Sequence, residues 1–368
     1  MATLAPRRGL RTGRIASIAE ALLTPHGMDR YLELIDPMFV RREIRGTVTD
    51  VTHQTADTVT LRIKPNGRWR GFDAGQYVRV SVDIDGVRRT RCYSPAGSAH
   101  HPGAELELTI KADPNGLVSR YLHTNAHRGM VLGLSQPDGD FTLPTQRPGR
   151  LLLLSGGSGI TPVMSMLRTL VDEHYTGEIV VLHYANTAED MLYARELRSL
   201  AERHPNVRVA LACTHAEHGG DLHGVFSRAH LDSVAPRWAE AETYLCGPTP
   251  LMNSVRELFA AQDFSEHLHT EEFAPPPLAL DTEGATGTVR FAHSGKQIDN
   301  SGKPLLEQAE DAGLRPEHGC RMGICFSCTQ VKTAGCVRDA RSGERNTDDN
   351  TEIQLCISVP EGDVEIAC

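Results

Sequence analysis

Short stretches of alternating apolar and polar residues follow one another between residues 46 and 142. They cover residues 47–51, 58–63, 77–82 and 106–110. Alternation with a period of two predicts half-buried strands, and the Pro-Asn-Gly and Asp-Gly segments between them are typical of turns. The pattern predicts an antiparallel β-barrel domain at residues 44–146.

From Leu151 onward, apolar strands alternate with helical stretches. Strands are predicted at residues 151–154, 178–183, 207–212 and 244–246, and helices follow the first two. This alternation is typical of a parallel sheet covered by helices. We therefore place an α/β domain at residues 147–273.

The remaining segments have sequence patterns that differ from those of these two domains. Residues 274–287 include three successive prolines and no periodicity, which predicts a semi-rigid linker. Residues 288–368 contain strand patterns at 289–293, 353–355 and 364–366 and a helical pattern at 304–312, which predicts an α+β domain. Residues 1–43 are predicted to form a helical leader that is too short for a core of its own.

Composition narrows the class of protein. The 368 residues suffice for two to three domains of roughly 150 residues each, and 40% hydrophobic with 23% charged residues is ordinary for a globular protein. A net charge of −9 argues against a nucleic-acid binder. No apolar run is long enough to span a membrane, and Glu20 interrupts the stretch where a secretory signal would need apolar residues. We therefore expect a cytoplasmic location.

A cysteine cluster is the most specific signal in the chain. Cys320, Cys325 and Cys328 have the spacing C-x4-C-x2-C, and Cys356 follows after 27 intervening residues, which is the plant-type spacing of a 2Fe-2S centre. A zinc site and unrelated buried cysteines are the alternatives, but zinc sites favour two close pairs and only one such set is present. Cys336 is the rival for the fourth ligand. Cys356 is preferred because it ends a hydrophobic strand pattern.

A second motif, Arg91-Cys92-Tyr93-Ser94, follows a predicted barrel strand. An arginine can pair with a pyrophosphate, and a tyrosine ring can cover an isoalloxazine. Downstream, Gly116 to Ser119 opens a predicted helix whose N-terminus can hold phosphate. For the first motif taken alone, an exposed arginine beside a half-buried tyrosine is an equally good interpretation.

Two further motifs lie in the α/β domain. The segment Gly156-Gly157-Ser158-Gly159-Ile160-Thr161-Pro162 joins a strand to a helix, which favours a phosphate cradle, although it is neither a G-x-G-x-x-G fingerprint nor a Walker loop. The segment Cys246-Gly247-Pro248 ends the last strand predicted in this domain, at the edge where open α/β sheets bind ligands. A buried cysteine before a turn is the alternative there.

With these motifs in this order, residues 44–368 resemble the ferredoxin-NADP reductase superfamily, in particular one-component reductases with a C-terminal plant-type ferredoxin domain. The resemblance implies FAD, an NADPH or NADH site, and a β-grasp ferredoxin domain with a 2Fe-2S cluster. A flavin is needed because nicotinamide delivers two electrons and the cluster accepts one. It also implies flavin contacts, with Arg91 at the pyrophosphate, Tyr93 at the isoalloxazine, Ser94 near N5, and Gly116 and Ser119 at phosphate.

The same resemblance assigns the nicotinamide side of the site. It implies dinucleotide contacts from Gly157, Gly159, Thr161, Gly247 and Pro248, a place for Cys246 beside the nicotinamide ring, and a place for Glu271 and Phe273 close to the flavin. Cys246, Ser94 and Glu271 are the expected catalytic residues. Tyr193 matches a tyrosine beside the adenine. On the next helix, Arg195 and Arg198 are near enough to accommodate a 2′-phosphate, which favours NADPH. Glu189 and Asp190 would oppose that phosphate if they pointed inward.

The electron acceptor is predicted from the leader. Residues 22–26 and 35–37, with residues 319–325, resemble bacterial reductases that serve membrane stearoyl-CoA Δ9-desaturases. We therefore expect an oxygenase-type partner, a membrane desaturase, that brings the chain to the inner face of the membrane. The alternatives are a ring-hydroxylating oxygenase, a cytochrome P450, or a non-enzymatic iron-sulfur sensor. From residue 281 onward the chain contains 15 Asp and Glu but only 9 Lys and Arg. This negative charge favours a partner with a basic surface, and an equally good interpretation is that it only keeps the domain soluble.

Overall fold

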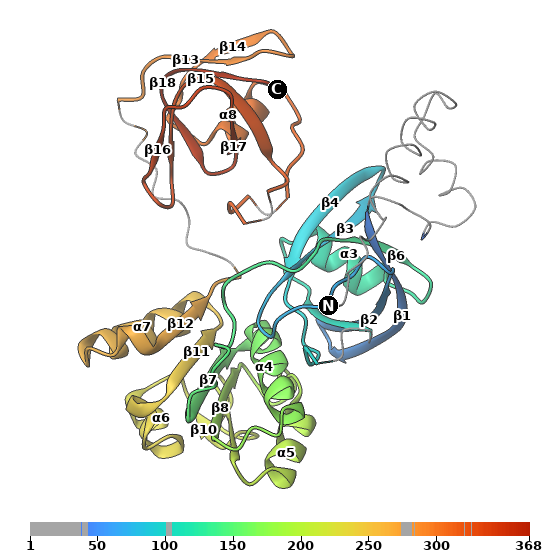
Figure 1. Ribbon diagram of the computed structural model, residues 1–368, viewed down its shortest axis with the longest axis vertical. Helices are drawn as coiled ribbons and strands as arrows, with labels where there is room; N and C mark the ends of the chain where they lie inside the picture. Colours follow the sequence, from blue (N-terminus) through green and yellow to red (C-terminus); the bar gives the residue numbers. More distant parts are fainter. Residues whose placement is uncertain are drawn as a thin grey trace, which may run out of the picture.

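A computed structural model describes residues 38, 43–100, 105–273, 282, 284–319, 321–324 and 326–368. It contains three sheets, each built from one continuous part of the chain (Figure 1). Most of the predicted leader, the centre of the predicted linker, and Cys320 and Cys325 lie outside the described residues. No helix in the described part is both long enough and apolar enough to cross a bilayer.

The first sheet is an antiparallel half-barrel, which confirms the predicted pairing. Its order is β4-β3-β6-β1-β2-β5, and an isolated bridge between Pro95 and Leu108 draws its two ends together. Alternate residues point into one apolar core, because side chains along a strand alternate between faces. The elements are β1 (Ile44–Thr55), β2 (Thr58–Pro65), β3 (Val78–Ile84), β4 (Val87–Tyr93), β5 (Leu106–Lys111), α3 (Leu117–Asn125) and β6 (Val131–Leu134).

The second sheet is parallel throughout, as predicted, with the order β10-β9-β8-β7-β11-β12. Since β7 lies between β8 and β11, the strand order reverses at its carboxyl end, where such sheets bind ligands. Its strands are β7 (Arg150–Gly156), β8 (Glu178–Ala185), β9 (Val207–Cys213), β10 (Leu222–His223), β11 (Glu242–Cys246) and β12 (Leu268–Glu271). Its helices are α4 (Ile160–Asp172), α5 (Ala194–Arg203), α6 (Arg228–Val234) and α7 (Thr249–Ala261), with short 3-10 turns at Gly157–Gly159, Trp238–Glu240 and Ser265–His267.

Helices cover both faces of the parallel sheet. One face packs against α4 and α5 in a core that also includes Ala96 and Phe141 from the half-barrel side. The other face packs against α6 and α7. Because the first core crosses from one sheet to the other, the half-barrel and the parallel sheet share buried apolar surface.

The third sheet is mixed, with the order β14-β13-β18-β15-β16 and β17 paired to β15. Leu305, Leu306 and Ala309 of its helix pack into the core beneath it. The elements are β13 (Thr288–Phe291), β14 (Lys296–Asp299), α8 (Leu305–Asp311), β15 (Thr329–Asp339), β16 (Arg345–Asn346), β17 (Thr351–Gln354) and β18 (Ser358–Ile366). The sequence pattern did not predict β15, the longest of these strands.

Candidate active site

A glycine turn closes the gap between β7 and β11. Gly157 has φ +54°, and a Cβ on Gly159 would lie 2.3 Å from the Cys246 carbonyl oxygen. A Cβ on Gly156 would lie 2.7 Å from Cδ of Pro248. Glycine is therefore required for these two strand ends to approach so closely, and the turn leaves backbone amides at the start of α4 where a phosphate binds.

Two polar residues expected at phosphates serve the local turns. Thr161 is buried, and its hydroxyl donates to the Ser158 carbonyl at 3.2 Å. Ser119 accepts from the Asp113 amide at 3.2 Å and lies 3.4 Å from the Gly116 carbonyl. These hydroxyls shape the two helix N-termini, so the amides of those helices are the better phosphate donors.

Three buried groups meet where the half-barrel joins the parallel sheet. Cys246 and Glu271 end neighbouring strands and are register partners, and Ser94 follows β4. The Ser94 hydroxyl and Glu271 Oε2 are both buried without a hydrogen-bond partner in the described part of the chain. Buried polar atoms of this kind need a partner, and a polar ligand bound between the two sheets would supply one.

Burial controls the ionisation of this site. It raises the pKa of Glu271 to about 8, and the nearby Ser94 hydroxyl offsets only part of that shift. Burial also raises the pKa of the Cys246 thiol, and Glu271 and Glu272 add to the effect. Near neutral pH the site therefore holds a protonated carboxyl and a neutral thiol.

The other expected flavin contacts lie around this point. Tyr93 ends β4 and is half-buried, and burial raises the pKa of its phenol. Phe273 packs against the core shared by the two sheets. Arg91 donates to the Thr90 carbonyl at 2.8 Å and to the carbonyl of Gly319 in the third segment. The structure thus gives Arg91 an inter-segment contact that the sequence did not predict.

Two of the four predicted cluster ligands lie in the described part, and both are buried in the core of the third segment. Cys328 is 2% exposed and Cys356 is 4% exposed. The Gly323 amide donates to Sγ of Cys356 at 3.3 Å, so Cys356 lies against the loop that carries the other predicted ligands. Amide donors to sulfur are typical of iron-sulfur sites.

Cys336 lies elsewhere. It lies eight residues after Cys328 along β15, which at about 3.3 Å per residue corresponds to up to about 26 Å of strand. Its thiol faces the Glu361 carboxylate at 3.7 Å. Burial and this carboxylate raise the pKa of the Cys336 thiol. The geometry favours Cys356 over Cys336 as the fourth ligand.

The loop of residues 319–326 contacts the half-barrel. Besides the Arg91 contact, the Tyr77 hydroxyl donates to the Ile324 carbonyl at 3.2 Å. The Arg79 guanidinium lies 6.0 Å from the centre of the Phe326 ring. These contacts come from β3, β4 and the residue before β3, so the loop lies beside the strand that leads to Tyr93 and Ser94.

Comparison with known proteins agrees with this geometry. Residues 45–143 match an oxidoreductase FAD-binding domain, and residues 153–257 match an oxidoreductase NAD-binding domain. An NADPH oxidoreductase from Mycobacterium tuberculosis is 38% identical over 95% of this chain and 90% of its own length. The chain belongs to the ferredoxin-NADP reductase superfamily. It is an NAD(P)H oxidoreductase of the ferredoxin reductase type, so the non-enzymatic sensor is excluded.

Other members of the superfamily extend the match. The glycine betaine monooxygenase reductase subunit of Pseudomonas aeruginosa is 34% identical and covers 80% of this reductase and 87% of its own length. The structure of phthalate dioxygenase reductase, at 23% identity and a TM-score of 0.57, shares the fold over 88% of this chain and 97% of its own. Two features of the site fit a bound dinucleotide and flavin. They are the glycine turn and the two buried oxygens, the Ser94 hydroxyl and Glu271 Oε2, that lack a hydrogen-bond partner in the described part of the chain.

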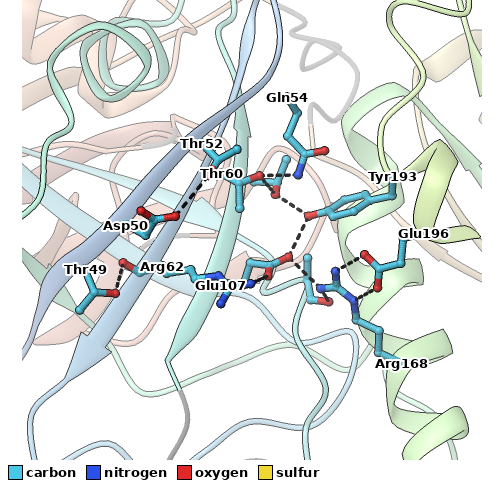
Figure 2. Close-up of polar contacts among 12 residues, drawn as sticks. Thr49, Asp50, Thr52, Gln54, Thr60, Arg62, Glu107, Arg168, Tyr193 and Glu196 are labelled. Atoms are coloured by element: carbon cyan, nitrogen blue, oxygen red, sulfur yellow. Dashed lines mark hydrogen bonds and ion pairs between the residues drawn. The ribbon is translucent and has the colours of Figure 1, made fainter.

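Tyr193 of this reductase packs in the contact between the parallel sheet and the half-barrel, which the sequence did not predict, and its contact with adenine stays a prediction. It is 7% exposed, and its hydroxyl bonds Thr109 at 2.5 Å and Glu107 at 3.3 Å inside the contact with the half-barrel (Figure 2). The backbone of Tyr193 is left-handed, with φ +57°, which turns the ring inward. Arg195 is exposed and has no ion pair within the described residues.

Beside Tyr193 lies a half-buried charge network that no sequence pattern predicted. Arg168 of α4 makes two 2.7 Å bonds to Glu196 of α5 and one of 2.7 Å to Glu107 of β5 (Figure 2). A further 2.7 Å bond reaches the Ala96 carbonyl. Burial opposes the charge on Arg168, but the two carboxylates outweigh it and raise its pKa. The network joins the half-barrel to the parallel sheet close to the active site.

We expect Arg168→Met to lower the free energy of unfolding by roughly 3–5 kcal/mol, because it leaves the Glu107 and Glu196 carboxylates without their cation. Urea unfolding followed by circular dichroism measures the loss. Arg237→Met is the control, since Arg237 pairs with Glu240 on the surface, where both side chains are over half exposed, and we expect it to cost under about 1 kcal/mol. Equal losses in the two variants would show that the network does not stabilise the junction.

Proposed function

We propose that this reductase passes electrons from NADPH through FAD and a 2Fe-2S cluster to an oxygenase-type partner. The observation that carries the proposal is the position of the 319–326 loop against the half-barrel, where Arg91 and Tyr77 donate to its carbonyls. When bound, FAD accepts electrons in pairs from nicotinamide and releases them singly, as a cluster requires. Reductase components of oxygenase systems among the relatives support this assignment.

We also propose that residues 288–368 form a β-grasp ferredoxin domain with Cys320, Cys325, Cys328 and Cys356 as ligands. The mixed sheet packed on α8, the burial of Cys328 and Cys356, and the Gly323 amide at Cys356 support it. Phthalate dioxygenase reductase, which shares this fold over 88% of the chain, transfers electrons from pyridine nucleotides to a 2Fe-2S centre. The spacing of the four cysteines supplies the donor set that such a cluster needs.

Within the active site, this chain's own residues control protons and water. The neutral Glu271 carboxyl and the Ser94 hydroxyl offer hydrogen bonds at the junction of the two sheets, where a flavin ring would lie. Cys246 and Tyr93 supply apolar walls that exclude water. The turn amides at Gly157 and Gly159 and the N-terminus of α3 would hold phosphate groups.

A membrane desaturase is a second candidate partner, favoured by the leader. The match to the mycobacterial NADPH oxidoreductase spans 95% of the chain, so it must include part of residues 1–43, where the resemblance to desaturase reductases lies. The matches to glycine betaine monooxygenase reductases span 80%. Through such a partner the chain would work at the cytoplasmic face of the membrane.

Rapid mixing with NADPH in the absence of oxygen tests the proposed electron path. We expect bleaching of the flavin absorption, followed by the EPR signal of a reduced 2Fe-2S centre. Turnover with purified soluble oxygenase components and, in parallel, with desaturase-containing membranes then separates the two partners. Flavin reduction without any cluster signal would disprove the electron path.

We expect NADPH to be preferred over NADH. Arg195 is exposed after the second strand of the parallel sheet, where it can reach a 2′-phosphate. Arg195→Ala should lower kcat/KM for NADPH roughly tenfold, about 1.4 kcal/mol, and leave the value for NADH unchanged. Arg198→Ala is the control, because Arg198 is held by Asp221 at 2.7 Å. Steady-state kinetics with both coenzymes measure this, and an equal loss with both would contradict the role of Arg195.

A further inference from the structure

A groove of about 790 Å³ opens in the third segment beside the proposed cluster loop. Most of its lining residues are polar, and its apolar lining consists of Val337, Ile353 and Ile357, here called the floor, and of Phe326. Ile357 directly follows the proposed ligand Cys356, and Phe326 lies between the proposed ligands Cys325 and Cys328. A molecule in this groove would therefore lie next to the residues that we propose hold the cluster.

The rim of the groove carries more acidic than basic side chains. Glu344, Asp348 and Glu352 line it, are exposed, and form no ion pair with any described residue. Arg345 also lines the groove but is held by Glu361 at 2.8 Å, and the buried Lys332 ammonium donates to the Asp348 carbonyl at 2.7 Å. The excess of exposed negative charge therefore lies mainly at Glu344 and Glu352, where it attracts cationic groups.

Phe326 is suited to binding a protein segment. It is 53% exposed, although an aromatic residue of this size is normally buried. Its backbone is left-handed, with φ +56°, a conformation that is strained for a residue with a side chain. An exposed aromatic ring held in this conformation offers an apolar contact to a docked partner.

The half-barrel contacts the loop at different atoms. Tyr77 and Arg91 hold the carbonyls of Ile324 and Gly319, neither of which lines the groove. Phe326 is shared, with Arg79 near its ring. A ligand can therefore enter the groove while the loop keeps its backbone contacts with the half-barrel.

We propose that this groove docks a cationic segment of the electron-accepting protein while the loop remains on the half-barrel. The inference rests on the proposed function, since it places the electron acceptor beside the proposed cluster. An acidic rim around an apolar floor matches a partner surface in which Lys or Arg side chains surround an apolar contact. Entry and exit of electrons then use two sides of one loop, so the third segment does not have to leave the half-barrel in each cycle.

Binding of oxidised cytochrome c, a small basic haem protein, tests the groove without turnover. Titration calorimetry at low ionic strength should show that Glu344→Lys with Glu352→Lys weakens binding at least tenfold. The matched control is Asp299→Lys with Glu307→Lys, which changes the net charge equally at exposed positions outside the groove. We expect the control pair to change binding less than twofold.

The outcomes separate the groove from the proposed function. Equal weakening by both pairs would show attraction by net charge alone and overturn the groove, as would no change in either pair. Reduction of cytochrome c by NADPH, measured separately, tests the electron path. Its absence with a normal binding result would disprove the proposed function and leave the docking surface supported.

Discussion

Replacing Cys356 with serine is expected to abolish the visible absorption of the 2Fe-2S centre and the EPR signal of its reduced form, while NADPH still reduces the flavin at the wild-type rate. Cys356 is 4% exposed and accepts the Gly323 amide, so it lies where a cluster held by the 319–328 loop would need its last thiolate. A serine hydroxyl is a much poorer ligand for iron in such clusters than a thiolate. Iron content, absorption and EPR measure the loss.

The control for this prediction is Cys336→Ser. Cys336 lies along β15 with its thiol at Glu361, so the substitution should leave the iron content and both spectra unchanged. A thiol so close to a carboxylate tolerates replacement by a hydroxyl, which also donates a hydrogen bond. If Cys336→Ser removed the signals and Cys356→Ser kept them, the ligand assignment would be reversed.

The parallel sheet shows what local patterns can predict. Residues 151–154 are four consecutive leucines, and the strand forms at Arg150–Gly156 because a central parallel strand is buried on both faces. The glycine turn after it was predictable for the same local reason. A run of this kind is determined by nearby residues, so it needs no knowledge of distant partners.

The strand β15 shows why other elements escaped prediction. Lys332 in this strand is fully buried, and its ammonium is satisfied by the carbonyls of Gly335 and Asp348 at 2.7 Å each. A buried lysine and a glycine interrupt the apolar alternation on which the prediction depends. The stabilising partner lies on a loop sixteen residues away, and a pattern over a short window does not include it.

The active site also combines features that local sequence patterns predict with features that they do not. Cys246 was identified from its place at a strand end and Glu271 from the family resemblance, but their register pairing follows from the sheet order, which no local motif encodes. The packing of Tyr193 was not predicted, for a related reason. Its left-handed backbone and its contacts with Thr109 and Glu107 depend on how two sheets pack, and the motif around it describes one of them.

The acidic residues of the third segment show that their number alone does not predict their role, because the role depends on where they lie. The excess of Asp and Glu after residue 281 was compatible with solubility alone. Several of those carboxylates, such as Glu310 and Asp311, are engaged by Arg321 and Lys303. Glu344 and Glu352 instead line one groove and form no ion pair with any described residue, and this arrangement is what distinguishes the proposed docking surface from a solvated one.

The second large effect is expected at Glu271, through the pH dependence of flavin reduction. Burial raises the pKa of this carboxyl from 4.5 to about 8, so it is neutral at pH 7 and becomes charged as the pH rises through about 8. Hydride transfer brings negative charge into the pocket, and an ionised Glu271 beside it would oppose that charge. The rate constant for flavin reduction by NADPH should therefore fall above pH 8.

Glu271→Gln tests this argument, because glutamine keeps the shape and hydrogen bonding of the neutral acid but cannot ionise. Stopped-flow reduction between pH 6 and 9.5 should show that the variant lacks the fall seen in the wild type. Glu272→Gln is the control, since Glu272 is held by Arg256 at 2.6 Å and should leave the pH profile unchanged. A wild-type profile in Glu271→Gln would mean that another group causes the fall.

The raised pKa of Glu271 also predicts how the free energy of unfolding depends on pH. The dependence is opposite to that of a salt-bridged acid, whose contribution to stability grows as the pH rises. Since the folded pKa of Glu271 lies above the unfolded value, its contribution is fully present below pH 4.5 and is lost as the pH rises to about 8. A shift of this size corresponds to roughly 5 kcal/mol at most. Glu271→Gln should therefore unfold at a higher urea concentration than the wild type at pH 9 and at a similar one at pH 5. The difference between those two pH values separates ionisation of Glu271 from any general effect of the substitution on packing.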